Sequence, residues 1–171
     1  MCMLHSKEYG VFLASDIILI DMRNLLVISL LFSTLANFAQ QTMTFEELDS
    51  ALLDKPKRTV IFLHTDWCKY CQSMKATSFK NEELISTLNE EFYFVMFNGE
   101  EKETVSFQNK SYSYIPRGAT SGSHELAFEI GQIDGKLLFP SIVILDTNLT
   151  VLYKRASFHS ASELLKVIGQ F

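Results

Sequence analysis

The chain has few cysteines, prolines and glycines, which are the residues that cross-link a small protein or bend its backbone sharply. Its 171 residues include three cysteines, three prolines, seven glycines and one tryptophan. Three cysteines are too few for the disulfide framework of a cysteine-rich secreted domain. The low glycine and proline content excludes collagen-like and low-complexity chains. Each cysteine therefore needs its own explanation.

Positive charge is also scarce in this sequence. Fifteen lysines and arginines face 20 acidic residues, which gives a formal net charge of −5. A domain that binds nucleic acid usually carries a basic excess, so we expect no nucleic-acid partner. Hydrophobic residues make up 47% of the chain and include 14 phenylalanines. This composition predicts one globular domain with a phenylalanine-rich core.

An apolar run covers residues 25–36, directly after Met22 and Arg23. The run is short for a membrane span and is typical of the hydrophobic part of a signal peptide. We expect residues 22–39 to be a signal peptide, with an uncleaved membrane anchor as the alternative. Translation would then start at Met22, and residues 1–21, including Cys2, would be an N-terminal extension assigned in error. The mature protein is expected to be periplasmic or secreted, or anchored to the membrane by this segment.

Residues 40–171 are expected to form one domain of alternating helices and strands. Two segments, which begin at Thr44 and Ser160, have the capping-box pattern of a hydroxyl residue followed three positions later by glutamate. The expected elements are, in chain order, a helix from Thr44 through Leu52, a strand over 59–63, a helix from the cysteine pair to about Phe79, a helix from Asn81 through Leu88, a strand over 92–97, a helix over 124–130 capped by Ser123, strands over 140–145 and 149–154, and a last helix from Ser160 through Ile168.

Residues 98–122 do not fit this alternation. Val105 and Phe107 alternate with polar residues, and Tyr112 and Tyr114 do the same after an asparagine-containing turn. This pattern predicts an inserted β-hairpin. A flexible loop over residues 117–122 is expected to follow it.

Two cysteines spaced C-x-x-C follow a strand-like run and a tryptophan, in the sequence H-T-D-W-C-K-Y-C over residues 64–71. A strand that delivers this pair to the start of a helix is typical of a redox-active dithiol. The helix N-terminus favours negative charge and lowers the pKa of the first thiol. We expect Cys68 to be an exposed nucleophile and Cys71 to resolve the mixed disulfide. Lys69 and Tyr70 would tune the redox potential, with Lys69 favouring the thiolate.

Two other interpretations of the cysteine pair remain open. A passive disulfide would stabilise the fold little, because the loop that it closes is very short. A Zn²⁺ or copper site would use His64, Cys68 and Cys71, with His124 or His159 as a fourth ligand. His64 lies inside an expected strand, and the other two histidines lie at expected helix starts, where we expect them to be solvated. We therefore favour the dithiol and expect no metal.

Two motifs resemble the thioredoxin superfamily. The first is W-C-x-x-C over residues 67–71, and the second is F-P-S-I-V-I-L-D over residues 139–146, where that family carries a cis-proline facing the dithiol. The resemblance runs from about Thr44 to the C-terminus. It implies an α/β, thioredoxin-like fold, in which helices flank a central mixed sheet of four to five strands. The hairpin within residues 98–122 would be inserted before the helix that precedes the cis-proline strand.

The resemblance also implies roles for the side chains around the dithiol. Trp67, Phe139 and Pro140 would bind the substrate, since the backbone beside a cis-proline can pair with an extended segment. His64 would at most tune the site. Phe62 occupies the position of a buried acid that assists the deeper cysteine in thioredoxin itself. The proton of that cysteine would need another acceptor, such as water, Lys57 or Glu46.

The pattern D-W-C-x-x-C-x-x-M over residues 66–74, with Phe79 after it, resembles exported thioredoxin-like domains, including the C-terminal domain of the membrane thiol-reductase DsbD. We therefore expect an exported thiol-disulfide oxidoreductase that reduces or isomerises disulfides in exported proteins. It would need no cofactor beyond Cys68 and Cys71, act as a monomer, and could receive electrons from a membrane protein. The alternatives are a non-catalytic thioredoxin-like binding module and, less favoured, a metal carrier that uses His64, Cys68 and Cys71.

Overall fold

The computed structural model describes residues 39–171, so the expected signal peptide and N-terminal extension lie almost wholly outside the described residues. No helix within 39–171 is long and apolar enough to cross a membrane. The elements are, in chain order, α2 (Phe45–Asp54), β1 (Arg58–His64), α3 (Lys69–Ala76), the 3₁₀ helix η1 (Ser78–Lys80), α4 (Glu82–Glu91), β2 (Phe92–Asn98), β3 (Val105–Phe107), β4 (Lys110–Tyr112), β5 (Tyr114–Pro116), β6 (Gly122–His124), α5 (Glu125–Gly131), β7 (Ser141–Leu145), β8 (Val151–Ala156) and α6 (Ala161–Ile168).

Four of these strands form the central sheet, in the order β2-β1-β7-β8. β1 pairs with β2 in parallel and with β7 antiparallel, and β8 pairs antiparallel with β7. The expected mixed sheet is therefore confirmed, with four strands. β2 lies at one edge, where the segment before α2 contributes a hydrogen bond from Met43 N–H to the Phe94 carbonyl.

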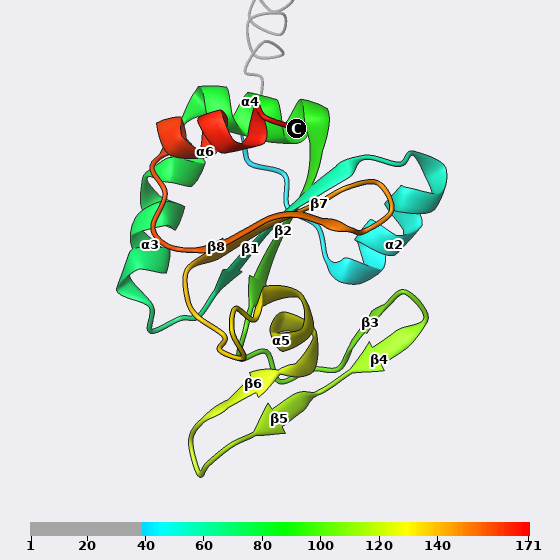
Figure 1. Cartoon of the computed structure of the whole chain (residues 1–171), viewed down its shortest axis with the longest axis vertical. Helices are drawn as coiled ribbons and strands as arrows, with labels where there is room; N and C mark the ends of the chain where they lie inside the picture. The colour runs from blue at the N-terminus through cyan, green and yellow to red at the C-terminus, as the bar shows by residue number, and fades with distance from the viewer. Residues whose placement is uncertain (1–38) are drawn as a thin grey trace, which may run out of the picture. The chain divides into compact units, whose positions relative to one another are not determined.

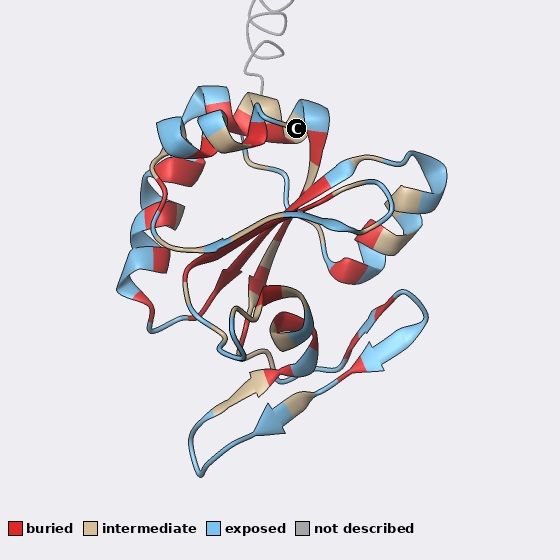
Figure 2. Ribbon diagram, in the orientation of Figure 1, coloured by how far each residue is buried: buried red, intermediate tan, exposed pale blue. Residues whose placement is uncertain are grey.

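Helices cover both faces of this sheet (Figure 1). Successive side chains of a strand point to opposite faces, so Val60 and Phe62 of β1 enter one core while Ile61 and Leu63 enter the other. The first core also contains residues of α3, α4 and α6, and the second contains residues of α2, α5 and the β3–β4 hairpin. Figure 2 shows the inner strands buried and the outer helix surfaces exposed.

The start signals read from the sequence are present in the structure. Both capping boxes form, with the side chain of Thr44 or Ser160 accepting from the third helical N–H and the glutamate accepting from the cap N–H. Asn81 caps α4 by accepting a hydrogen bond from Leu84 N–H. These short polar side chains satisfy helix N–H groups that have no partner within the helix.

Two element boundaries differ from the expected ones. The helix after the cysteine pair ends at Ala76, and Ser78–Lys80 continue as a separate 3₁₀ turn. Ser78 donates a hydrogen bond to the His159 carbonyl, which ties this turn to the segment before α6. β8 begins at Val151 rather than at residue 149, because Leu149 has a φ of 64° and belongs to the turn after β7.

The inserted hairpin is confirmed as β3 and β4, except that Tyr114, expected on its second strand, belongs to β5. Gln108 and Asn109 join the two strands, and both have a positive φ, 53° and 58°. Positive φ at both central residues is the geometry of a type I′ turn, whose twist matches that of the strands.

The loop expected over residues 117–122 is present over 117–121, whereas Gly122 already belongs to a strand that was not predicted. This region connects a second hairpin, in which Tyr114 pairs with His124 and Pro116 pairs with Gly122. The helix that follows is capped by His124 rather than by Ser123. These strands are three residues long and carry no apolar alternation, so the sequence pattern offered no strand signal there.

Candidate functional site

The two cysteines lie where β1 leads into α3. Cys68 is the N-cap of α3, and its sulfur accepts a hydrogen bond from Cys71 N–H at 3.1 Å. A disulfide joins the two residues, whose Cα atoms are 5.2 Å apart. The pair is therefore held at a helix N-terminus, where the free N–H groups favour a developing negative charge on sulfur.

The two sulfur-bearing residues differ in burial. Cys68 is 5% exposed and Cys71 is fully buried within the core formed with α4 and α6. The expectation that Cys68 is exposed was wrong for the disulfide form, because its neighbours cover most of it. Cys68 is still the one of the two that solvent reaches, which fits attack from outside at Cys68 and not at Cys71.

Trp67 and Phe139 lie together beside the cysteines. Trp67 is 67% exposed, and its ring meets the Phe139 ring edge to face, with a centroid distance of 6.4 Å. The indole N–H donates to a carboxylate oxygen of Glu100 at 3.0 Å. The Phe139-Pro140 peptide bond is cis, and the buried Pro140 directly precedes β7. The structure thus brings both sequence motifs to one place.

Large apolar side chains near the disulfide are exposed. Besides Trp67, Tyr70 is 68% exposed, and Leu138 precedes Phe139 with 47% exposure. Lys69, the first residue of α3, is also exposed. An exposed apolar surface around a reactive group is suited to contact with another protein chain.

His64 lies at the end of β1, on the same strand face as Phe62. Its ring stacks on the Phe62 ring at a centroid distance of 5.6 Å. Lys75 Nζ lies 3.1 Å from His64 Nδ1 and 3.2 Å from Nε2. Burial, and then the Lys75 charge, lower the pKa of His64 from 6.5 to about 4. His64 is therefore a neutral acceptor at neutral pH.

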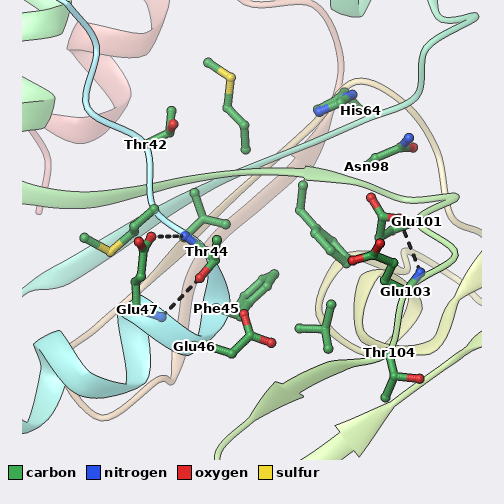
Figure 3. Close-up of a pocket in the computed structure, with 15 residues that line it drawn as sticks. Thr42, Thr44, Phe45, Glu46, Glu47, His64, Asn98, Glu101, Glu103 and Thr104 are labelled. Carbon is green, nitrogen blue, oxygen red and sulfur yellow. Dashed lines mark hydrogen bonds between the residues drawn. The ribbon is translucent and has the colours of Figure 1, made fainter.

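A groove of about 630 Å³ lies along the edge of β2 and is lined by His64 but by neither cysteine. Figure 3 shows His64 and Asn98 on one side of it and the Thr44–Glu47 capping box on the other. Three of its acidic side chains are already bonded, since Glu46 accepts from Ser106 N–H, Glu47 from Thr44 N–H and Glu101 from Lys102 N–H. We therefore place the candidate site at the exposed surface around the disulfide.

The other two histidines are buried, contrary to the expectation that they are solvated. His124 Nδ1 accepts from Leu126 N–H, and its Nε2 lies 3.2 Å from the Glu103 carbonyl oxygen. His159 contacts the Tyr153 hydroxyl and the Ser157 carbonyl. Burial lowers the pKa of both rings. Within residues 39–171, no three His, Cys, Asp or Glu side chains lie close enough together to hold a metal ion.

The acceptors considered for the Cys71 proton are engaged elsewhere. Lys57 donates to the Glu90 carbonyl, and Glu46 accepts from Ser106 N–H. Phe62 is fully buried in the same core as Cys71.

Sequence reasoning missed Gly99, Glu100 and Lys75. Gly99 follows β2, and a Cβ atom added there would lie 2.3 Å from the Phe139 ring. Glu100 follows it and holds the Trp67 indole. Gly99 could have been found from the sequence, because a glycine directly after an apolar strand often marks a close backbone approach.

Comparison with known proteins supports this arrangement. The family model for the thioredoxin-like domain matches residues 45–171. Among solved structures, the chain is similar to a thioredoxin from Thermus thermophilus, with 16% identity, a TM-score of 0.55 and coverage of 77% of this chain and 86% of that one. It is also similar to the DsbH oxidoreductase, with 16% identity, a TM-score of 0.50 and coverage of 77% and 83%.

The C-terminal domain of DsbD from Neisseria meningitidis, in its oxidised form, also matches, with 18% identity, a TM-score of 0.48 and coverage of 73% and 90%. The comparison with curated proteins found no match. The structural matches concern the fold, whereas the family model rests on the sequence of most of the chain and includes both Cys68 and Cys71. The chain belongs to the thioredoxin-like family.

Proposed function

We propose that this protein is a thiol-disulfide oxidoreductase that acts on disulfides of exported proteins. The observation that carries the proposal is the Cys68–Cys71 disulfide at the N-terminus of α3, with its outer cysteine beside an exposed aromatic surface. The family model and the thioredoxin-like fold support the same chemistry. No cofactor is needed, because the two sulfurs themselves carry the electrons.

In the reducing direction, the Cys68 thiolate attacks one sulfur of a partner disulfide. A new bond forms between Cys68 and the partner, and the partner's other sulfur leaves as a thiolate that takes up a proton. The Cys71 thiol then loses its proton and attacks Cys68. The Cys68–Cys71 bond forms while the partner's second sulfur leaves, so the partner gains two electrons and the dithiol is oxidised.

The surface around the disulfide suits this partner. Trp67, Tyr70 and Leu138 offer apolar area, and the chain beside Pro140 is positioned to accept an extended segment. We propose a protein substrate on this basis, since the exposed surface resembles a docking face more than a pocket for a small molecule.

Two cysteine variants test the proposal. Cys68→Ser is expected to abolish reduction of a protein disulfide, whereas Cys71→Ser should accumulate a mixed disulfide with the substrate, because attack occurs but resolution does not. Turnover and mass spectrometry of the trapped adduct measure the two effects. A Cys68→Ser chain that retains wild-type turnover would refute the proposal and favour a non-catalytic binding module.

A further inference from the structure

Cys71 lies in surroundings that oppose its ionisation. It is fully buried, and the core around it contains apolar side chains such as Phe62, Met74 and Phe79. Burial in apolar surroundings raises the pKa of a thiol. The exchange reaction proposed above nevertheless requires the Cys71 thiolate, because the thiolate is the nucleophile. A nearby group must therefore offset the cost of burial.

The strand residues at the level of Phe62 supply no such group. Phe62 of β1 is in register with Met96 of β2 on one side and with Ile142 of β7 on the other. All three side chains are apolar. The helix that carries Cys71 does offer a compensating charge.

Lys75 lies one turn after Cys71 on α3. Side chains four residues apart share one face of a helix, with Cβ atoms about 5–6 Å apart. Lys75 is half-buried, and its ammonium lies against both ring nitrogens of His64 at 3.1 and 3.2 Å. His64 in turn stacks on Phe62, which belongs to the same core as Cys71. These contacts hold the ammonium at the margin of that core.

The charges around Lys75 keep it available for this role. His64 is neutral, so its ring can accept a hydrogen bond from the ammonium without repelling it. Burial lowers the pKa of Lys75, and the Asp66 carboxylate, which also acts on His64, opposes that shift and favours the protonated ammonium. Lys69 is at the other end of α3 from Lys75, directly after Cys68.

We propose that Lys75, positioned by His64, stabilises the Cys71 thiolate and so sets the rate of the resolving step. The proton of Cys71 leaves to water, and the ammonium offsets the negative charge that remains on sulfur. This inference rests on the proposed function, in which Cys71 resolves a mixed disulfide. It assigns the electrostatic task to a helix lysine, because the paired strand residues Phe62, Met96 and Ile142 are apolar.

The test measures the pKa of Cys71 directly. In a full-length chain carrying Cys2→Ser and Cys68→Ser, Cys71 is the only thiol, and its ultraviolet thiolate absorbance is followed against pH. Lys75→Met is expected to raise the pKa by roughly one unit, which is about tenfold less thiolate at neutral pH. Lys75→Arg should keep the original value, and His64→Phe should give a smaller rise. Lys80→Met, an exposed lysine in the following turn, is the matched control and should change nothing.

A Cys71 pKa that is the same in Lys75→Met and Lys80→Met would overturn the inference. Lys75→Gln provides a second neutral variant if Lys75→Met fails to fold. In the chain with native cysteines, Lys75→Met should slow resolution of a mixed disulfide about tenfold at neutral pH and recover as the pH rises. An unchanged resolution rate would also overturn it. A Lys75 effect on the pKa in a chain that shows no exchange at all would refute the proposed function alone.

Discussion

Gly99 illustrates how one residue without a side chain shapes the surface around the disulfide. Its N–H donates to the His64 carbonyl and its carbonyl accepts from His124 N–H, each at 2.8 Å, so its backbone is fixed. The Phe139 ring occupies the space in which a Cβ would lie. The positions of Phe139, and of Trp67 against it, therefore depend on the absence of that atom.

Gly99→Ala is expected to displace Phe139 and to lower the rate of reduction of a protein disulfide by up to about 100-fold, since a displacement of about 1 Å in a positioning group can cost that much. Reaction of Cys68 with a small soluble disulfide should change little, because that reagent needs no docking surface. Comparing the two substrates in kinetic assays measures the effect. Gly118→Ala, where an added Cβ meets only the end of the Ser121 side chain, is the control. Equal loss with both substrates would contradict this account.

At this scale, the sequence predicted the residues that have a recognisable spacing. Cys68 and Cys71 were found from their position behind a strand, and Pro140 from its motif. The contact of Lys75 with His64 joins residues eleven positions apart in two different elements. It depends on how α3 packs against β1, which local spacing does not encode.

Several helices of this chain begin at a polar side chain that accepts a hydrogen bond from the first turn and so fixes where the helix starts. In α2, Thr44 and Glu47 satisfy each other's backbone N–H groups at 3.2 and 2.8 Å. This helix also contributes Phe45 and Leu48 to the second core. A weakened start of α2 therefore affects packing against the sheet.

Thr44→Ala is expected to lower the free energy of unfolding by about 1 kcal/mol, the usual cost of losing an N-cap hydroxyl. Urea denaturation at neutral pH measures the change. Thr42→Ala is the matched control, because Thr42 is exposed and lies just before the cap. The explanation fails if the two variants unfold at the same urea concentration.

Elements with strong periodicity or a capping signal were predicted well, and short elements were not. The β3–β4 hairpin was recognisable because apolar and polar residues alternate around its turn. The β5–β6 hairpin is instead defined by strand pairing across the connection of residues 117–121 and by the close approach of Gly122 to the Tyr114 ring. Such contacts arise from the fold and leave no periodic trace in the sequence.

Within residues 39–171, three histidines are buried in separate places. Burial is the largest cause of the lowered pKa of His64, His124 and His159. Each ring therefore takes up a proton more readily in the unfolded chain than in the folded one. Protonation of these residues favours unfolding, and their combined effect is a property of the whole fold.

We expect the free energy of unfolding to fall as the pH is lowered from about 7 to about 5. The folded pKa of His64, about 4, lies below its ordinary value of 6.5, so stability is lost as the pH falls through this window. His64 alone should contribute about 2 kcal/mol to the difference between these two pH values. Denaturation curves across the range measure it, and His64→Phe should reduce the dependence. An unchanged slope in that variant would contradict the assignment.

Trp67 is the only tryptophan of the chain, and it lies beside the Cys68–Cys71 disulfide with most of its ring in solvent. Indole emission from this protein therefore comes from a single position, next to the sulfur atoms of the proposed redox pair. No second indole elsewhere in the sequence adds a background signal. The protein thus contains its own optical reporter, through which the oxidation state of the cysteine pair and the arrival of a partner can be followed without any label.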